Sequence, residues 1–197
     1  MIGAGVAGLA CAATLSRAGL RVCVLEARGC LGGRARSWRD AHTGVVVDIG
    51  PHVVSTEHRQ FMRLLRQLGT DRDVSWQPQP LIELHDAQGR LTVPMSDCMP
   101  PLHGLPMLPA RLLHARVHRI RPAIPQPRPG SETLRPANRT AVAGLLLAGD
   151  WTDTAVPCSM ESAARSAALA CEAVLGPGHA LPAPETCGLV GLLRRRA

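Results

Sequence analysis

The sequence predicts an α/β fold, and three observations support this prediction. A glycine-rich turn with Gly3, Gly5 and Gly8 opens the chain. Good helix formers follow at residues 9–18, and a short apolar stretch with β-branched residues comes next at residues 21–25. Glycines at this spacing between a strand and a helix, with another strand after the helix, are typical of a βαβ unit that binds a dinucleotide. A glycine-rich turn without a ligand is the alternative.

Each glycine of this turn has its own expected task. Gly3 would allow a tight turn out of a strand, Gly5 would let the backbone approach a pyrophosphate, and Gly8 would let the helix pack on the sheet. The helix would direct free N–H groups of its first turn at the phosphates, and Gly19 would end it. Only two residues precede Gly3. We therefore expect a truncated first strand.

Glu26 follows the second predicted strand, about 18 residues after the last glycine of the turn. A carboxylate there can accept hydrogen bonds from both ribose hydroxyls, and it would repel the 2′-phosphate of NADP. A loop rich in glycine and arginine comes directly afterwards, and its backbone and arginines are candidates to hold phosphate oxygens. The candidate residues of this loop are Ala27, Arg28, Gly32, Gly33 and Arg34. A basic surface loop without a ligand is the alternative.

Composition excludes several functions. The net charge of +7 comes from arginine alone, because the chain has no lysine. Neither a Schiff base to pyridoxal phosphate nor a P-loop lysine can therefore form. The arginines are scattered without interleaved aromatic residues, so we expect no binding of nucleic acid. With one Phe, three Trp and no Tyr, the core is expected to consist of Leu, Val, Ala and Met.

The cysteines and the hydropathy pattern bear on localisation. The seven cysteines form no CxxC pair, and no cluster of metal ligands is present, so we expect no metal site. Buried reduced thiols and the lack of a secretory leader favour a cytoplasmic protein. No apolar stretch approaches the ~20 residues that span a bilayer. The expected protein is soluble or peripheral to a membrane.

The middle of the chain contains weaker signals. A strand is predicted at residues 45–49, before Gly50 and His52, and we expect His52 to be structural. Apolar residues at helical spacing predict a core-packed helix at residues 57–68, with an N-cap at residue 55 or 56 and a stop at Gly69. The apolar residues are Phe61, Leu64, Leu65 and Leu68. Residues 81–84 and 90–93 predict a hairpin, and residues 115–124 predict a strand.

A second informative stretch lies near the end of the chain. A buried strand at residues 145–148 would deliver Gly149 and Asp150 to a turn. A helix is predicted from about residue 159 to 175, and Gly176 would end it. An ordinary strand, turn and helix with an Asp N-cap is the alternative to a ligand site.

On these motifs the chain resembles the flavin-dependent amine oxidoreductase superfamily, in which a GxGxxG turn, a glutamate and a GGR loop hold FAD. Spacing alone leaves FAD and NAD open. The resemblance implies a three-layer, Rossmann-like FAD-binding fold, in which residues 21–25, 45–49 and 145–148 lie in or beside one sheet. It places Gly50 near the isoalloxazine ring, Asp150 at the ribityl chain, and the backbone of Met160 at the flavin pyrimidine.

The sequence LAGDWTDT at residues 147–154 is most similar to the squalene-associated and phytoene-desaturase-like branch, which includes hydroxysqualene dehydroxylase. Members that oxidise amines use two aromatic residues and a lysine at the flavin, and this chain has neither Tyr nor Lys. The resemblance therefore implies a lipophilic isoprenoid or squalene-type substrate and hydride transfer at flavin N5, with no catalytic side chain assigned. An inactive, incomplete FAD- or nucleotide-binding remnant is the alternative.

The resemblance also divides the chain. Residues 1–93 and 115–176 correspond to two parts of an FAD-binding domain. Residues 94–114 are expected to be a linker at a deletion that replaces most of the substrate domain. Residues 177–197 are expected to form a flexible tail. Its Leu- and Arg-rich end is a candidate for peripheral membrane contact, with a frayed terminus as the alternative.

Overall fold

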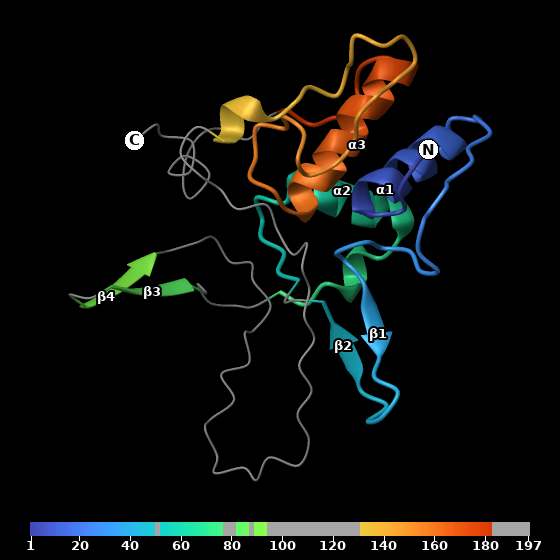
Figure 1. Cartoon of the computed structure of the whole chain (residues 1–197). Helices are drawn as coiled ribbons and strands as arrows, with labels where there is room; N and C mark the ends of the chain where they lie inside the picture. Colours follow the sequence, from blue (N-terminus) through green and yellow to red (C-terminus); the bar gives the residue numbers. More distant parts are fainter. Residues whose placement is uncertain (50–51, 77–81, 87–88, 94–130, 183–197) are drawn as a thin grey trace.

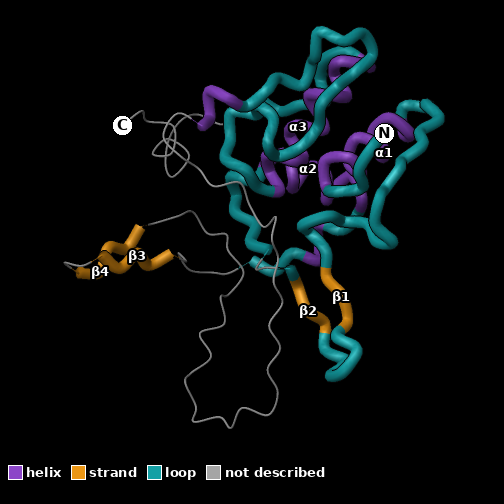
Figure 2. The backbone as a smooth tube through the Cα atoms, viewed as in Figure 1, coloured by secondary structure: helices purple, strands orange, loops and turns teal. Residues whose placement is uncertain are grey.

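A computed structural model describes residues 1–49, 52–76, 82–86, 89–93 and 131–182 (Figure 1). Three α-helices and four short strands lie within these ranges, and the helices gather into one group (Figure 2). The elements are α1 (Val6–Arg17), β1 (Ser37–Arg39), β2 (Val46–Asp48), α2 (Arg59–Leu68), η1 (Asp71–Asp73), β3 (Ile82–Asp86), β4 (Gly89–Val93), η2 (Ser131–Leu134) and α3 (Met160–Leu175).

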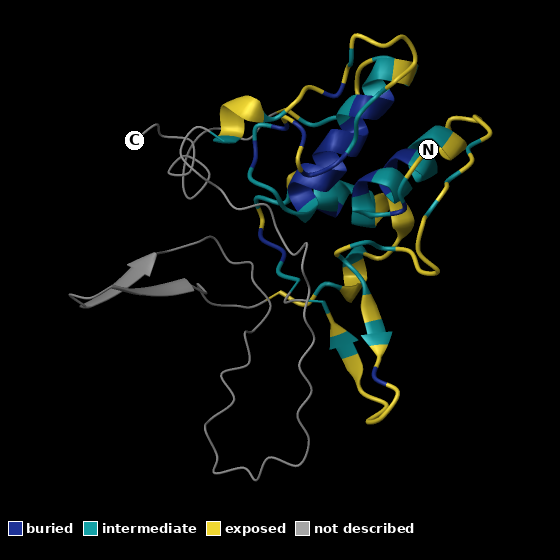
Figure 3. Cartoon of the chain, in the orientation of Figure 1, coloured by how far each residue is buried: buried dark blue, intermediate teal, exposed yellow. Residues whose placement is uncertain are grey.

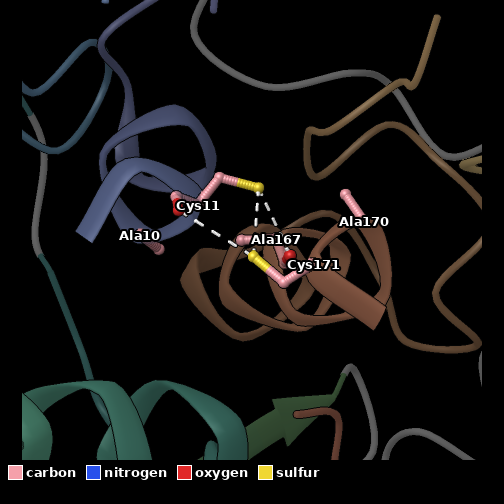
Figure 4. Close-up of a cluster of buried hydrophobic side chains, with 5 residues drawn as sticks. All are labelled: Ala10, Cys11, Ala167, Ala170 and Cys171. Atoms are coloured by element: carbon pink, nitrogen blue, oxygen red, sulfur yellow. Dashed lines mark hydrogen bonds between the residues drawn. The ribbon is translucent and has the colours of Figure 1, made fainter. Parts of the chain in front are cut away.

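Helices α1 and α3 form the centre of the structure, although they come from opposite ends of the described chain. Their contact consists of small buried side chains, which let the two helices approach closely. These side chains are Ala10, Cys11, Ala167, Ala170 and Cys171 (Figure 4). Figure 3 shows that burial is concentrated on α3. The described core thus contains mainly Ala and Cys, and the expected large share of Leu and Met is wrong, because leucines lie only at its margin.

The two central cysteines lie close together. The Sγ atoms of Cys11 and Cys171 are 3.6 Å apart, and the Cys11 thiol donates to the carbonyl of Ala167 at 3.3 Å (Figure 4). The hydrogen bond with Cys171 and the burial of the thiol raise the pKa of Cys11, so it stays protonated. Both cysteines are free thiols, as expected, whereas Cys23 and Cys30 are exposed.

The predicted first and last helices form. Helix α1 begins at Val6, three residues earlier than predicted, because the extended backbone of Gly5 serves directly as its N-cap. Gly19 follows the end of α1 with a φ of +87°, a conformation that favours glycine. Helix α3 has the predicted bounds, since Ser159 caps it and accepts a hydrogen bond from the N–H of Ser162.

Helix α2 also forms, but its predicted N-cap is wrong. His58 occupies the N-cap position and makes no side-chain cap. Instead the carboxylate of Glu161 on α3 accepts the N–H groups of Gln60 and Phe61, at 3.0 and 2.8 Å. Gln60 and Met62 are therefore the buried residues of α2. The predicted apolar face is wrong for Leu68, which is 52% exposed, because α2 meets polar atoms of α3.

The predicted single sheet does not form among the described residues. β2 pairs only with β1, as an antiparallel hairpin. Leu25 makes one parallel bridge, to Ile2. Leu146 makes one antiparallel bridge, to Arg139. Isolated bridges therefore replace two of the three predicted strands.

The predicted hairpin is confirmed, since β3 and β4 pair antiparallel with Asp86 opposite Gly89. The predicted linker at residues 94–114, the strand at 115–124, Gly50 and residues 183–197 lie outside the described residues. The first residues of the predicted flexible tail are tied to α3, because Glu172 accepts the N–H groups of Gly178, His179 and Ala180. Within the described ranges, no helix is long and apolar enough to cross a membrane.

Candidate functional site

The glycine turn has the geometry that its sequence predicts. The N–H of Gly3 donates to the carbonyl of Leu25 at 2.7 Å, and its φ is +97°. A Cβ on Gly8 would lie 2.0 Å from the carbonyl oxygen of Gly3, so only glycine allows the helix to lie this close to the turn. A Cβ on Gly5 would meet nothing within 4 Å. The turn therefore packs tightly at Gly8 and leaves open space at Gly5.

The N-terminus of α1 fits an anion. Its N-cap, Gly5, has no side chain, and no acidic residue lies in the first helical turn. The positive end of the helix dipole and the first N–H groups therefore have no carboxylate from this turn to balance them. Together with the open space at Gly5, this arrangement suits a phosphate group, which is bulky, negative and rich in acceptors.

Glu26 lies directly beside the glycine turn. Its Oε2 accepts the N–H of Ala4 at 2.8 Å, and its Oε1 accepts the N–H of Arg28 at 3.0 Å. The Ala4 bond first, and the Arg28 bond second, lower the pKa of Glu26, so the carboxylate is ionised at neutral pH. Each carboxylate oxygen keeps further acceptor capacity. The carboxylate is therefore held in a fixed orientation and can still accept a ligand hydroxyl. Ala27 and Arg28 are exposed.

The GGR loop packs on the glycine turn. The N–H of Gly32 donates to the carbonyl of Ala4 at 2.8 Å. Gly33 has a φ of +59°, and a Cβ on it would lie 3.1 Å from the Cα of Gly5. Close backbone approach and a positive φ thus favour glycine at position 33, and a φ of +95° favours it at position 32. As a result, the glycine turn and the GGR loop, which are both predicted to bind phosphates, form one continuous surface.

Arg34 links this surface to the second informative stretch of the sequence. Its Nη2 donates to Oδ1 of Asp150 at 2.5 Å, across 116 residues of sequence. The Asp150 side chain is 10% exposed, and that of Arg34 is 41% exposed. His52 Nε2 donates to the carbonyl of Arg34 at 3.1 Å, which agrees with the expected structural role of this histidine.

Side chains of α3 fix the Gly149–Asp150 turn by hydrogen bonds to its backbone. The N–H of Gly149 donates to Oγ of Ser166 at 2.9 Å, and Oγ of Ser162 donates to the carbonyl of Asp150 at 2.9 Å. A Cβ on Gly149 would lie 2.2 Å from Nε1 of Trp151, so the indole leaves no room for a side chain. Met160 is the first residue of α3. The turn and the helix N-terminus are therefore fixed relative to each other.

Sequence reasoning missed the polar residues that fix this arrangement. Ser162 and Ser166 are spaced four residues apart, on the α3 face that the turn covers, and this spacing on an Ala-rich helix was the available signal. The side chains of Arg135, Asn138, Thr152 and Thr154 join the same network. Their hydrogen-bond partners lie far away in sequence or at irregular spacing, so no local sequence pattern predicts these contacts.

Comparison with known proteins identifies the family. The sequence model for flavin containing amine oxidoreductases matches residues 6–122 and 107–175. The chain belongs to the flavin-containing amine oxidoreductase family. FAD is accordingly its cofactor, and the family implies an FAD-binding fold of the Rossmann type. The described residues contain the turns and helices of such a unit, with two two-stranded sheets.

Individual relatives match over short stretches. Hydroxysqualene dehydroxylase of Rhodopseudomonas palustris is 46% identical over 71 residues, which are 36% of this chain and 17% of that protein. L-amino-acid oxidase of Mus musculus is 44% identical over 69 residues, 35% of this chain and 11% of that protein. The structure of a putrescine oxidase bound to putrescine is 33% identical, has a TM-score of 0.35, and matches 47% of this chain and 20% of that chain.

Among the residues that the structure describes, no three His, Cys, Asp or Glu side chains come together in a way that could hold a metal ion. The donor set at the Arg34–Asp150 junction consists of backbone N–H groups, a carboxylate and guanidinium groups. Such a set suits phosphates and hydroxyls.

Proposed function

We propose that this chain is an FAD-dependent oxidoreductase that acts on an isoprenoid or squalene-type lipid. The observation that carries the proposal is the ion pair between Arg34 and Asp150, which brings the two predicted cofactor-binding regions to one place. A single extended dinucleotide would contact both regions at once when they lie this close together.

In the proposed site, FAD lies across the junction. Gly3, Gly5 and Gly8 and the N-terminus of α1 hold the phosphates, and Glu26 accepts the ribose hydroxyls. Asp150 accepts hydroxyls of the ribityl chain, and the N–H of Met160 faces the flavin pyrimidine. Ala27, Arg28, Gly32, Gly33, Arg34, Gly50 and Gly149 complete the proposed set.

Bound FAD would accept a hydride at its N5 atom or, once reduced, donate one. The contribution of the protein is orientation and electrostatics. The N-terminus of α3 carries a partial positive charge, which would stabilise negative charge at the flavin pyrimidine. No side chain among the described residues is assigned as an acid, base or nucleophile.

The lipid substrate is supported by composition and by the relatives. The chain has no Lys and no Tyr to form the aromatic and lysine set expected of amine-oxidising members. Hydroxysqualene dehydroxylases of three organisms match at 38–46% identity over 71 residues. Amino-acid oxidases match with similar identity over 69 residues, so a direct comparison of substrates is needed.

The test begins with the absorbance of the purified protein, where bound flavin gives bands near about 370 and 450 nm. The oxidised protein is then mixed without oxygen with squalene and with an amino acid, and protein whose flavin has first been reduced is mixed with hydroxysqualene. Bleaching of the ~450 nm band by squalene, or return of this band on adding hydroxysqualene, is expected. Bleaching by the amino acid alone would overturn the lipid assignment. Colourless protein that does not take up FAD would instead favour an inactive remnant.

A further inference from the structure

Arg135 is a buried cation beside the proposed flavin site, and neither its position nor its residue type had been predicted to matter. Its side chain is only 7% exposed. Nη2 donates to the carbonyl of Asp150 at 2.5 Å, and Nη1 donates to the carbonyl of Val156 at 2.6 Å. One guanidinium thus binds the backbone at both ends of the connection between the Asp150 turn and α3.

The same guanidinium reaches the hydroxyl groups that support this connection. Nη2 contacts Oγ of Ser162 at 3.0 Å and Oγ1 of Thr154 at 3.3 Å. The two hydroxyls are 2.7 Å apart, and Ser162 also donates to the carbonyl of Asp150. Ser162 lies in the first turn of α3. Arg135 therefore sets the position of the turn relative to the N-terminus of the helix.

The charge of Arg135 has an additional effect. Its ion-pair partner, Glu132, is 2.6 Å from Nη1 but has a side chain that is 47% exposed, so solvent weakens this compensation. Nε of Arg135 is buried and has no hydrogen-bond partner among the described residues. A buried positive charge consequently lies beside the N-terminus of α3, whose first turn also carries Glu161. The guanidinium and the helix end favour negative charge on a group bound at this point, and an ionised Glu161 opposes them.

We propose that Arg135 is a positioning residue for FAD. It holds the Asp150 turn and the N-terminus of α3 at the spacing at which both contact one flavin, and its charge adds to that of the helix end. This role rests on the proposed function, because it requires that the junction binds FAD. Neither the family match nor the sequence motifs assign a role to Arg135.

The test compares Arg135→Met and Arg135→Lys with a matched control, Arg63→Met. Arg63 also binds backbone carbonyls, those of His179 and Gly178 at 3.1 and 3.2 Å, but in the segment after α3. Each protein is measured for thermal stability without FAD, FAD affinity, and the reduction potential of bound flavin. Amide hydrogen exchange is also measured, particularly at Thr152 and Asp153, whose N–H groups donate to the carbonyls of Gly149 and Pro136.

Arg135→Met is expected to weaken FAD binding about tenfold or more, to make the flavin potential more negative, and to speed exchange at Thr152 and Asp153. Arg135→Lys keeps the charge but cannot donate to Asp150 and Val156 in the same fork geometry. It should therefore lose affinity and retain a potential near that of the wild type. The Arg63→Met control should lose only thermal stability.

Wild-type FAD affinity and potential in Arg135→Met would overturn the role of Arg135 and leave the proposed function intact. If Arg135→Met does not fold, Arg135→Lys decides, and unchanged FAD affinity in this variant overturns the role. Absence of FAD binding by the wild-type protein would overturn the proposed function, and the role of Arg135 with it.

Discussion

Arg34 and Asp150 are bonded at 2.5 Å, although 116 residues separate them in sequence. Arg34 belongs to the loop that packs on the first glycine turn, and Asp150 follows the last predicted strand. Their ion pair is the direct contact between the two motifs on which the family resemblance depends. It also brings opposite charges into the place where the proposed dinucleotide would bind.

Replacing either partner of this pair tests how much it stabilises the protein. Because the Arg34 side chain is 41% exposed, the coupling free energy between Arg34→Gln and Asp150→Asn should be about 1 kcal/mol or less. Denaturant unfolding of both single variants and the double variant measures this coupling. The Asp150→Asn variant should lose FAD affinity more clearly than stability. Coupling well above this value would mean that the pair is a main element of the fold.

The first glycine turn provides a matched pair of substitutions. Gly5→Ala should leave the unfolding free energy almost unchanged, because an added Cβ meets nothing within 4 Å and the φ of −77° suits alanine. It should still weaken FAD binding, because the methyl group would point into the open space. Gly8→Ala should cost several kcal/mol, since its Cβ would lie 2.0 Å from the carbonyl oxygen of Gly3. Thermal unfolding and FAD titration of both variants check the difference.

Glu26→Gln removes the charge and keeps the size of the proposed ribose-binding side chain. Glutamine has one acceptor oxygen, so it cannot serve the N–H groups of Ala4 and Arg28 in the way that the carboxylate does. The FAD affinity of Glu26→Gln should be about tenfold lower than that of the wild type. Glu26→Ala should bind FAD more weakly still. The control is Glu57→Gln, which removes a charge before α2 and should leave FAD affinity unchanged. Full FAD affinity in Glu26→Ala would show that the carboxylate only organises the turn.

Two glutamates should affect stability in separate pH ranges. Burial raises the pKa of Glu161 above its ordinary value of 4.5, despite the N–H groups of Phe61 and Gln60. From pH 4.5 up to this raised pKa, the folded chain binds more protons than the unfolded chain, so the unfolding free energy falls as pH rises. Backbone N–H groups, that of Ala180 first, lower the pKa of Glu172. Its contribution is present above pH 4.5 and is lost as pH falls through the lowered pKa.

Unfolding free energies measured from about pH 3 to about pH 8, a range that spans the titration of carboxyl groups, separate these effects. The difference curve between the wild type and Glu161→Gln should slope above pH 4.5, and that for Glu172→Gln should slope below it. Difference curves are needed because burial also lowers the pKa of His58 from 6.5, which changes stability in an overlapping range. A flat Glu161→Gln curve above pH 4.5 would contradict the burial of a charged carboxylate.

Sequence reasoning succeeded where a local pattern specifies the structure. The three glycines of the first turn, the hairpin of β3 and β4, and the bounds of α3 all follow from spacing, turn residues and caps within a few positions. It failed where the partner is distant. The N-terminus of α2 is satisfied by Glu161, 100 residues away, and no pattern near α2 indicates this.

Strand pairing failed for a related reason. An apolar, β-branched stretch at residues 21–25 predicts a strand, but a strand needs neighbours to pair with, and the neighbour available to Leu25 is Ile2. Arg135 was missed because arginine usually marks a solvated surface. Only the fold reveals that its side chain is buried against the Asp150 turn.

The contact between α1 and α3 has a consequence for synthesis in the cell. Cys11 and Cys171, at the centre of that contact, are 160 residues apart, so α1 can meet its main packing partner only after a further 160 residues have been synthesised. At about 5–20 residues per second, the ribosome needs about 8–30 s to cover this distance. During this time the buried face of α1 has no α3 to cover it.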